Sequence, residues 1–120
     1  MTLALAQVVF DVSDDAARLA GFWSQVLGRP VAAGASPFFA VIPPAAPGAP
    51  AFMFLKVPEP KAGKNRLHVD LTAADWRAEA DRVVGLGAEK VGEFAEYGTE
   101  WVTLRDPEGN EFDIGAAHDQ

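Results

Sequence analysis

Gln7-Val8-Val9-Phe10-Asp11-Val12 is a strand-like stretch that leads directly into Ser13-Asp14-Asp15, residues able to cap a helix. Apolar side chains then recur at the three-to-four spacing of a helix as far as Gly28, a residue suited to a left-handed helix end. The same order returns in the second half, where residues 67–71 lead into a capping segment and a helical stripe that ends before Gly87. The sequence therefore predicts two similar strand-and-helix units.

Three strand-like segments follow each predicted helix. They are residues 30–33, 38–42 and 51–57 in the first half, and residues 90–94, 100–105 and 110–114 in the second. The turn Asp106-Pro107-Glu108-Gly109 predicts that the last two strands form a hairpin. We therefore expect an α+β fold in which two βαβββ modules form an open curved sheet in one domain. Module one covers about residues 1–58, a linker about 58–64, and module two about 65–117.

Composition and charge disfavour several classes of function. The 120 residues suit one compact domain, and 17 acidic against 10 basic side chains give a net charge of -7, which disfavours nucleic acid and anionic membrane surfaces as partners. No apolar stretch approaches the length of a membrane-spanning helix, and the first residues lack the pattern of a secretion signal, so we expect a cytoplasmic protein. Because the chain has no cysteine, metal ligands must be histidine, carboxylate or amide groups.

Alternate residues of each predicted strand should pack against a helix, and the residues between them should face a cleft. Gln7 on the first strand, His68 on the strand at 67–71 and Asp113 on the last strand all fall on the cleft side. The other residues expected on the cleft side are Val9, Asp11, Phe52, Phe54, Lys56, Arg66, Asp70, Thr72, Trp101, Thr103, Arg105 and Glu111, whereas Met53, Leu55, Val57 and Leu67 are among those expected to pack.

Gln7, His68 and Asp113 offer an amide oxygen, an imidazole and a carboxylate. This donor set suits Zn, Ni, Mn or Fe better than Ca, which prefers more oxygen ligands. Ordinary structural interpretations stand beside this one. His68 could be a hydrogen-bonded, half-exposed residue, and Asp113 could be a solvated carboxylate at a sheet edge. Arg66 could pair with Asp70 on its own strand or recognise an anionic substrate.

The segment Asp106-Pro107-Glu108-Gly109-Asn110-Glu111-Phe112 resembles the DP-[ED]-GN-xF hairpin of the vicinal oxygen chelate superfamily, which contains glyoxalase I, fosfomycin and bleomycin resistance proteins, and extradiol dioxygenases. Residues 22–28 and 64–71 resemble segments of its glyoxalase-like domain subgroup. The resemblance implies paired βαβββ modules that curl around a pocket, in a protein that is usually a homodimer. It also implies metal ligands on the first strand of each module and on the last strand of one or both.

Carried onto this chain, the ligand positions of the family fall at Gln7, His68 and Asp113, and the fourth falls at Phe54. A shift of 59 places between the two halves also aligns Phe54 with Asp113. Glyoxalase I has a glutamate at the fourth position, whereas a phenylalanine can neither bind a metal nor abstract a proton. Asp113 is therefore the candidate catalytic residue as well as a candidate ligand, and methylglyoxal isomerisation is not expected.

Two functions are compatible with these residues, while a third, in which the domain acts only through a protein partner, has no positive sign in the sequence. The first is a divalent-metal-dependent lyase, isomerase or dioxygenase that acts on a small substrate with vicinal oxygens. The alternative is a metal-free protein that binds an antibiotic or an aromatic or cationic metabolite. The residues expected to contact the small molecule are Phe52, Phe54, Lys56, Arg66, Asp70 and Trp101, and their aromatic members could instead be core.

Overall fold

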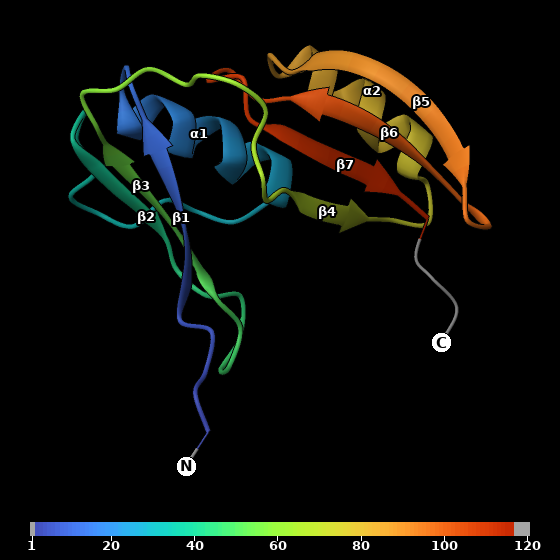
Figure 1. Cartoon of the computed structure of the whole chain (residues 1–120). Coiled ribbons are helices and arrows are strands. Elements are labelled where there is room, and N and C mark those ends of the chain that lie inside the picture. The colour runs from blue at the N-terminus through green and yellow to red at the C-terminus, as the bar shows by residue number, and fades with distance from the viewer. Residues whose placement is uncertain (1, 117–120) are drawn as a thin grey trace. The chain divides into compact units, whose positions relative to one another are not determined.

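The computed structural model describes residues 2–116. The chain divides into two compact units, Met1–Lys61 and Ala62–Gln120, and the division falls inside the proline-containing segment 58–64. Each unit contains one helix and one small sheet, so the fold is α+β as expected (Figure 1). Neither helix found in residues 2–116 is long and apolar enough to cross a membrane.

The first unit consists of β1 (Gln7–Val12), α1 (Ala16–Leu27), β2 (Phe39–Ile42) and β3 (Ala51–Lys56). β3 is the central strand, parallel to β1 and antiparallel to β2, and α1 packs against β2 and β3 (Figure 1). At the start of α1 the Asp15 carboxylate accepts a hydrogen bond from the backbone N–H of Arg18, and Gly28 ends the helix with a φ of 67°. Both boundaries of α1 confirm the prediction.

The strand predicted at residues 30–33 does not form. Pro30 has no N–H to give to a strand ladder, and Gly34 turns the chain with a φ of 93° directly after the segment. The segment is joined to β2 by a backbone hydrogen bond, in which the Ala32 N–H donates to the Val41 carbonyl oxygen at 2.8 Å. The first sheet therefore has three strands, whereas the second has four.

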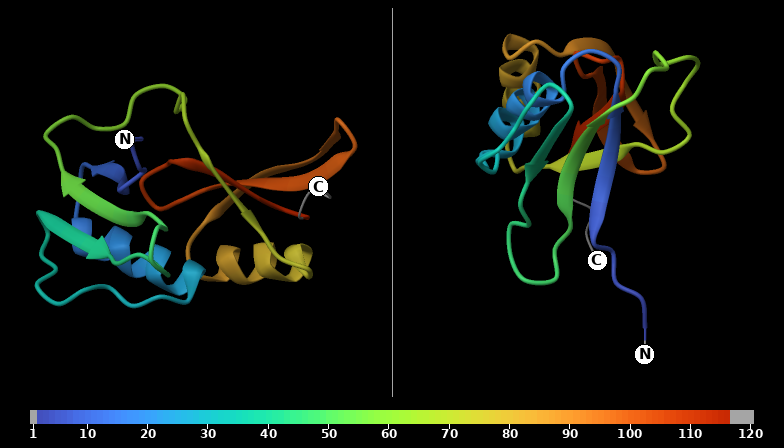
Figure 2. Two further views of the ribbon diagram at one scale, coloured as in Figure 1. Left: turned by 90° about the horizontal axis from the view of Figure 1, so that it is seen from below. Right: turned by 90° about the vertical axis from the view of Figure 1, so that its left-hand side faces the viewer.

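The second unit consists of β4 (Val69–Thr72), α2 (Trp76–Gly85), β5 (Glu89–Glu96), β6 (Thr99–Arg105) and β7 (Glu111–Gly115). The strand order is β4-β7-β6-β5, with β4 parallel to β7 and the other pairs antiparallel. Figure 2 shows α2 along one side of these strands. β4 begins later than predicted, so Leu67 lies outside the strand and is 80% exposed rather than packed.

The start of helix α2 departs from the prediction, whereas its end follows it. Asp75 precedes it without a capping hydrogen bond from its side chain, although the sequence predicts a capped start. Leu86 follows the helix in a right-handed conformation, so the glycine with positive φ, Gly87 at 122°, comes after the cap position. The Gly87 N–H donates to the Val84 carbonyl oxygen at 3.1 Å and the Ala88 N–H donates to the Val83 carbonyl oxygen at 3.3 Å, the two bonds of a glycine-terminated helix. The predicted glycine with positive φ therefore ends both helices, directly at the cap position of α1 and one residue later at α2.

The turn between β6 and β7 confirms the predicted hairpin. Asp106 lies buried in this turn, with 4% of its surface exposed. Its Oδ1 accepts hydrogen bonds from the backbone N–H groups of Glu108 and Asn110, both at 2.9 Å, and its Oδ2 accepts one from Asn110 Nδ2 at 3.0 Å. The aspartate of the motif therefore organises the turn, and Gly109 supplies the positive φ of 87° that the turn needs.

Aromatic rings form the core of the first unit. In the parallel register Val8 lies opposite Phe52 and Phe10 lies opposite Phe54, so all four side chains project to one side of the sheet. The Phe10 ring centroid lies 5.0 Å from that of Phe54 and 5.3 Å from that of Trp23 on α1. Phe54 is fully buried, and Phe52 is 8% exposed.

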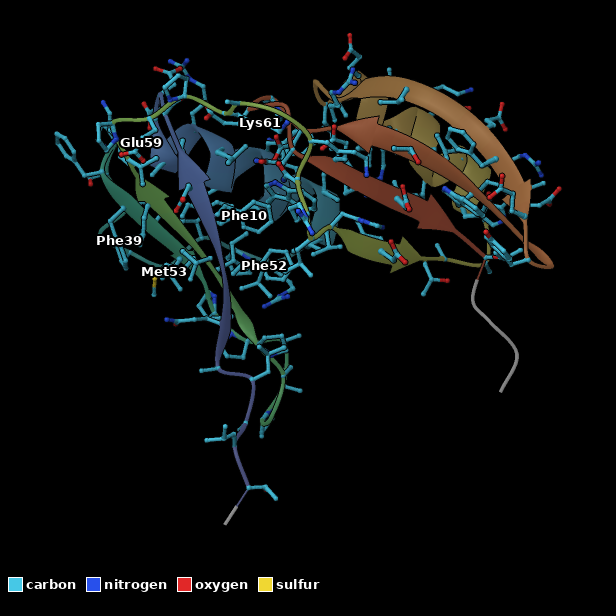
Figure 3. All side chains as sticks on the ribbon, in the orientation of Figure 1. Phe10, Phe39, Phe52, Met53, Glu59 and Lys61 are labelled. Atoms are coloured by element: carbon cyan, nitrogen blue, oxygen red, sulfur yellow. The ribbon has the colours of Figure 1, made fainter. Side chains whose placement is uncertain are left out.

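The predicted facing of β3 is therefore wrong, because Phe52 and Phe54 pack against the helix and Met53 and Leu55 lie on the other side. Figure 3 shows Phe39 and Met53 on the side of the sheet away from Phe10 and Phe52. The facing predicted for the other long strands is confirmed by their buried residues, which are Val12 on β1, Val102 and Leu104 on β6, and Phe112 and Ile114 on β7.

Candidate metal centre

Three side chains that can bind a metal converge on the face of the second sheet opposite α2, which we call the open face. His68 Nε2 lies 3.2 Å from Asp70 Oδ1 and 3.3 Å from Asp113 Oδ2. One ligand atom from each residue lies within 4.8 Å of the others. Asp70 and Asp113 are register partners on the parallel strands β4 and β7, so their carboxylates project to the same side of the sheet.

His68 lies just before β4, in an irregular segment tied to the β6–β7 hairpin. The Asn65 N–H donates to Glu111 Oε1 at 3.4 Å, and Asn65 Nδ2 donates to Asn110 Oδ1 at 3.0 Å. These bonds fix the segment beside the start of β7. The imidazole therefore reaches Asp113 from an anchored loop, whereas the sequence predicts a strand at this position.

Asp113 is the most constrained member of the cluster. Thr103 Oγ1 donates a 2.6 Å hydrogen bond to Asp113 Oδ1, and the two residues are register partners on β6 and β7. The Asp113 side chain is 17% exposed, compared with 43% for His68 and 72% for Asp70. One Asp113 oxygen is held by Thr103 while the other faces His68, and Asp70 is the freer of the two carboxylates.

The spacing and charge of the cluster fit a divalent cation. Two ligands that each lie about 2.1 Å from an ion are about 3.0 Å apart at octahedral angles and about 3.4 Å apart at tetrahedral angles. The two N···O distances, 3.2 and 3.3 Å, lie between these values. A single hydrogen on Nε2 cannot donate well to two carboxylates, whereas a cation held by His68 and Asp113 would attract the Asp70 carboxylate as well. It would also offset the repulsion between Asp70 and Asp113.

A cavity of about 490 Å³ opens beside the two carboxylates. It lies within the second unit, and we call it the open-face cavity. Trp101 forms one wall of this cavity. Its ring is held in place by Phe94, on which it stacks with centroids 5.7 Å apart and an interplanar angle of 24°. The lining residues are Asp70, Leu71, Thr72, Tyr97, Thr99, Glu100, Trp101, Asp113, Gly115 and Ala116.

A family model described as the glyoxalase-like domain matches residues 7–115, nearly the whole chain. The chain belongs to the glyoxalase-like domain family. This places it in the vicinal oxygen chelate superfamily, as the hairpin motif predicts. No curated protein sequence is significantly similar to this glyoxalase-like domain.

Solved structures share the fold at low sequence identity. A glyoxalase/bleomycin resistance protein/dioxygenase family enzyme from Burkholderia phytofirmans PsJN is 18% identical, with a TM-score of 0.78 over 97% of this chain and 100% of that chain. The fosfomycin resistance protein FosX from Listeria monocytogenes is 13% identical, with a TM-score of 0.76 over 98% and 93% of the two chains. Lactoylglutathione lyase from Agrobacterium tumefaciens is 17% identical, with a TM-score of 0.68 over 98% and 96%. At these identities the likeness shows the fold alone.

Of the ligands predicted for this glyoxalase-like domain, the structure brings His68 and Asp113 together and adds Asp70. Gln7 belongs to the first unit, where it is exposed at the start of β1. Its side of the sheet is the one opposite the aromatic core, because it alternates with Val8.

Phe54, which the sequence predicts at the fourth ligand position of the family, does not lie on the cleft side of its sheet. It lies on the side that carries the aromatic core, and we call the other side of this sheet its open side. Phe54 and Phe112 are both 0% exposed, so Phe54 corresponds in facing to Phe112 rather than to Asp113. The shift of 59 places therefore fails at this strand by one residue. The side chains of β3 that lie on the side opposite the aromatic core are Ala51, Met53 and Leu55, and none offers a nitrogen or oxygen ligand.

Two of the residues predicted to contact a substrate, Asp70 and Trp101, line the open-face cavity. Arg66 is exposed in the segment before β4, and Asp70 pairs with His68 rather than with Arg66. The remaining three belong to the first unit: Phe52 and Phe54 are core residues, and the Lys56 ammonium lies 5.5 Å from the centroid of the Phe38 ring.

Sequence reasoning assigns no role to three residues that shape this site. Thr103 is predicted on the correct face by strand alternation, but its bond to Asp113 depends on the β6–β7 register, which the sequence does not fix. Gly115 lines the cavity opposite Trp101 in the same register. Tyr97 lines it from the β5–β6 turn, and the available signal was the short Tyr97-Gly98 connection between two strand-like segments.

Proposed function

We propose that this glyoxalase-like domain is a small-molecule enzyme that uses a divalent metal ion and acts on a substrate with two neighbouring oxygens. The observation that carries the proposal is one imidazole nitrogen within 3.3 Å of two carboxylates, at the edge of a cavity of about 490 Å³. A structural relative supports the use of a metal, since FosX from Listeria monocytogenes is complexed with Mn(II) and 1S,2S-dihydroxypropylphosphonic acid. Zn, Ni, Mn and Fe are the candidate ions for this donor set.

The protein groups divide between holding the ion and moving a proton. Asp113 suits a ligand, because Thr103 fixes one of its oxygens while the other faces His68. Asp70 suits a general base, because it lines the cavity, is 72% exposed and contacts the imidazole through one oxygen, which leaves the other to accept a substrate proton. A bound divalent ion would stabilise the negative charge that develops on the substrate oxygens when this proton leaves.

This division favours a lyase or isomerase over a dioxygenase. Oxygen-activating iron sites commonly use two histidines and one carboxylate. His68 is the single histidine of residues 2–116, and its partners are two carboxylates. A second carboxylate beside a metal can act as the general base that abstracts a proton next to a carbonyl or hydroxyl. Asp113 therefore becomes a ligand in this proposal, and Asp70 takes the catalytic role.

Metal analysis tests the proposal directly. The wild-type chain, purified without chelators and then offered Zn²⁺, Ni²⁺, Mn²⁺ or Fe²⁺, should retain about one ion per chain after desalting. His68→Ala should lose the ion, while His118→Ala, which removes the other histidine of the chain, should keep it. Asp70→Asn should keep the ion too, because its proposed role is proton transfer. A metal-free wild type, or retention of the ion by His68→Ala, would overturn the proposal.

Gln7 remains a predicted ligand from the first unit, and the same measurement tests it. Gln7→Leu preserves side-chain size and removes the amide oxygen. If Gln7 binds the ion, this variant should hold it more weakly than the wild type, and Gln7→Glu, which keeps a carboxyl oxygen, should restore binding. Equal retention of the ion by all three proteins would show that Gln7 is not a ligand.

We also propose that the protein is the homodimer implied by the family resemblance. Light scattering after size-exclusion chromatography would measure its oligomeric state.

The alternative function is a metal-free small-molecule binding protein. The observation that favours it is the supported aromatic wall of the open-face cavity, where Trp101 stacks on Phe94. A wild-type chain that holds no ion, yet rises in melting temperature on addition of small aromatic compounds, would support binding over catalysis.

A further inference from the structure

The β5–β6 turn contains a strained residue at the rim of the open-face cavity. Glu96 pairs with Thr99, so Tyr97 and Gly98 alone connect the two strands. Both have positive φ, 54° for Tyr97 and 75° for Gly98. Tight hairpins of this kind prefer asparagine, aspartate or glycine at the first of these positions, because other side chains are strained there. Within residues 2–116, Tyr97 is the one residue other than glycine with positive φ.

Packing within the protein does not account for this tyrosine. Its surface is 95% exposed, and the structure shows no ring contact or side-chain hydrogen bond for it among residues 2–116. A bulky, exposed side chain in a strained conformation, with no ring contact or side-chain hydrogen bond to the part of the chain that the structure describes, does not stabilise that part. Tyr97 nevertheless lines the open-face cavity, together with Trp101 and the two carboxylates. Its phenol ring is therefore available to a ligand.

The opposite wall of the cavity is rigid. Trp101 is supported by Phe94, and its register partner is Gly115. A Cβ atom at Gly115 would lie 2.7 Å from the Glu100 carbonyl oxygen and 3.0 Å from the Trp101 Cβ, so a side chain cannot be accommodated here without moving the backbone. The cavity thus offers one fixed ring, one exposed ring and a floor kept free of a side chain.

The charged groups of the cavity are negative. Asp70 and Asp113 supply carboxylates, and no lysine, arginine or histidine is among the lining residues. Glu100 alternates with Trp101 and therefore projects to the helix side of the sheet, where its carboxylate lies 3.9 Å from Arg77. Two aromatic rings beside acidic groups recognise a positively charged ring compound, through stacking and cation–π attraction, and disfavour an anion.

We infer that Tyr97 is a ligand-contacting residue, and that the open-face cavity accepts a small aromatic molecule with a positive charge between Tyr97 and Trp101. The inference rests on the proposed function in one respect, that this cavity is where the enzyme binds its substrate. It deepens that function by assigning the strained turn to recognition and by giving the metal-free cavity a preference for cationic over anionic ring compounds. A substitution that relieves the backbone strain at Tyr97 but removes its ring should therefore raise the stability of the protein and weaken ligand binding.

The experiment compares Tyr97→Asn with Tyr97→Phe in the full-length chain. Asparagine tolerates positive φ, so Tyr97→Asn should raise the melting temperature by about 2–5 °C. It should weaken binding of the probe benzyltrimethylammonium, measured by calorimetry, by about three- to tenfold. Tyr97→Phe keeps the ring and should stay within twofold of the wild type in affinity, without the gain in melting temperature. Benzylphosphonate, the anionic probe, should bind the metal-free wild type at least tenfold more weakly than benzyltrimethylammonium.

Unchanged probe affinity in Tyr97→Asn, or equal binding of the two probes to the metal-free chain, would overturn the inference. Parallel probe titrations with the metal-loaded chain distinguish a failure of the inference about Tyr97 from a failure of the proposed metal-dependent function. A chain that holds one ion through His68 but binds no cationic probe contradicts the inference and leaves the metal proposal intact. A chain that holds no ion but binds the probe in a Tyr97-dependent manner contradicts the metal proposal and supports the ring contact.

Discussion

Replacing Thr103 with valine should weaken metal binding by about ten- to a hundredfold. The Thr103 hydroxyl donates a 2.6 Å hydrogen bond to Asp113 Oδ1 in a partly buried position. A hydrogen bond to a charged acceptor contributes about 1.5–3 kcal/mol. The bond already holds Asp113 in place before the ion binds, so its loss adds the cost of ordering this carboxylate to metal binding, and about 1.4 kcal/mol of such cost corresponds to a tenfold change in affinity. Removal of hydrogen bonds that orient metal ligands typically has effects of this size.

Isothermal titration with Zn²⁺ or Mn²⁺ at one fixed pH measures the change. Valine has nearly the shape of threonine, and Thr103→Ser keeps the hydroxyl while it loses the methyl group. If the hydroxyl positions Asp113, the serine variant should stay within about threefold of the wild type and the valine variant should not. Urea unfolding of the three metal-free proteins separates this effect from a general loss of stability. Wild-type affinity in Thr103→Val, or equal weakening in both variants, would refute the reasoning.

Three further substitutions test the fold. Asp106→Ala should lower the free energy of unfolding by about 2–4 kcal/mol in urea, because three N–H donors lose their acceptor, and Asp106→Asn should lower it by about half as much. Phe54→Ala should cost about 3–5 kcal/mol and Leu55→Ala less than half of that, since Phe54 is fully buried and Leu55 is not; the reverse order would contradict the facing of β3. Lys90→Met should raise the pKa of Glu93, which the Lys90 hydrogen bond and charge hold below its ordinary value. Carboxyl NMR titration measures this shift. Glu93 favours the folded state above its ordinary pKa of 4.5 and loses this contribution as the pH falls through its lowered pKa, so stability of the variant should depend less on pH in that acidic range.

The sequence predicts the repeated strand-and-helix order because its signals are local. Alternation along β1 separates Val12 from its exposed neighbours without knowledge of any partner strand. The cap at Asp15 and the glycine at Gly28 likewise act within a few residues of themselves. The β6–β7 hairpin is predictable for the same reason, since Asp106 accepts its bonds from residues two and four places away. Local chemistry thus accounts for most of the fold.

Facing along β3 cannot be read from its own residues. Ala51–Leu55 is continuously apolar, so alternation offers no way to choose which residues meet the helix. The parallel register with β1 decides the question, because it places Phe54 beside Phe10 and so in contact with the aromatic core. This register depends on residues more than forty places apart in the chain. The error at the predicted fourth ligand position follows from this missing long-range information.

Some features of the candidate site can likewise be predicted from the sequence, whereas others depend on the register between strands. His68 and Asp113 are identified from residue type and strand facing, with the family resemblance in support. The pairing of Asp70 with His68, and the bond from Thr103 to Asp113, depend on how β4, β6 and β7 are aligned. Tyr97 is strained only in the context of a turn whose length the strand register sets. The sequence therefore indicates the type of chemistry, and the register determines which groups can carry it out.

The two units share a framework but differ in what they place on their open sides. In the first unit, β3 presents Met53 and Leu55, which neither bind a cation nor accept a proton. The base that the glyoxalase I pattern would supply from this strand is therefore missing, and Asp113 cannot serve well as both ligand and base. In the proposed function the second sheet supplies a base instead, because its parallel register sets Asp70 beside Asp113 on the cavity wall. The proposed reaction thus depends on a carboxylate pair within one sheet, in which Asp113 is held by Thr103 and Asp70 has one oxygen that does not contact His68.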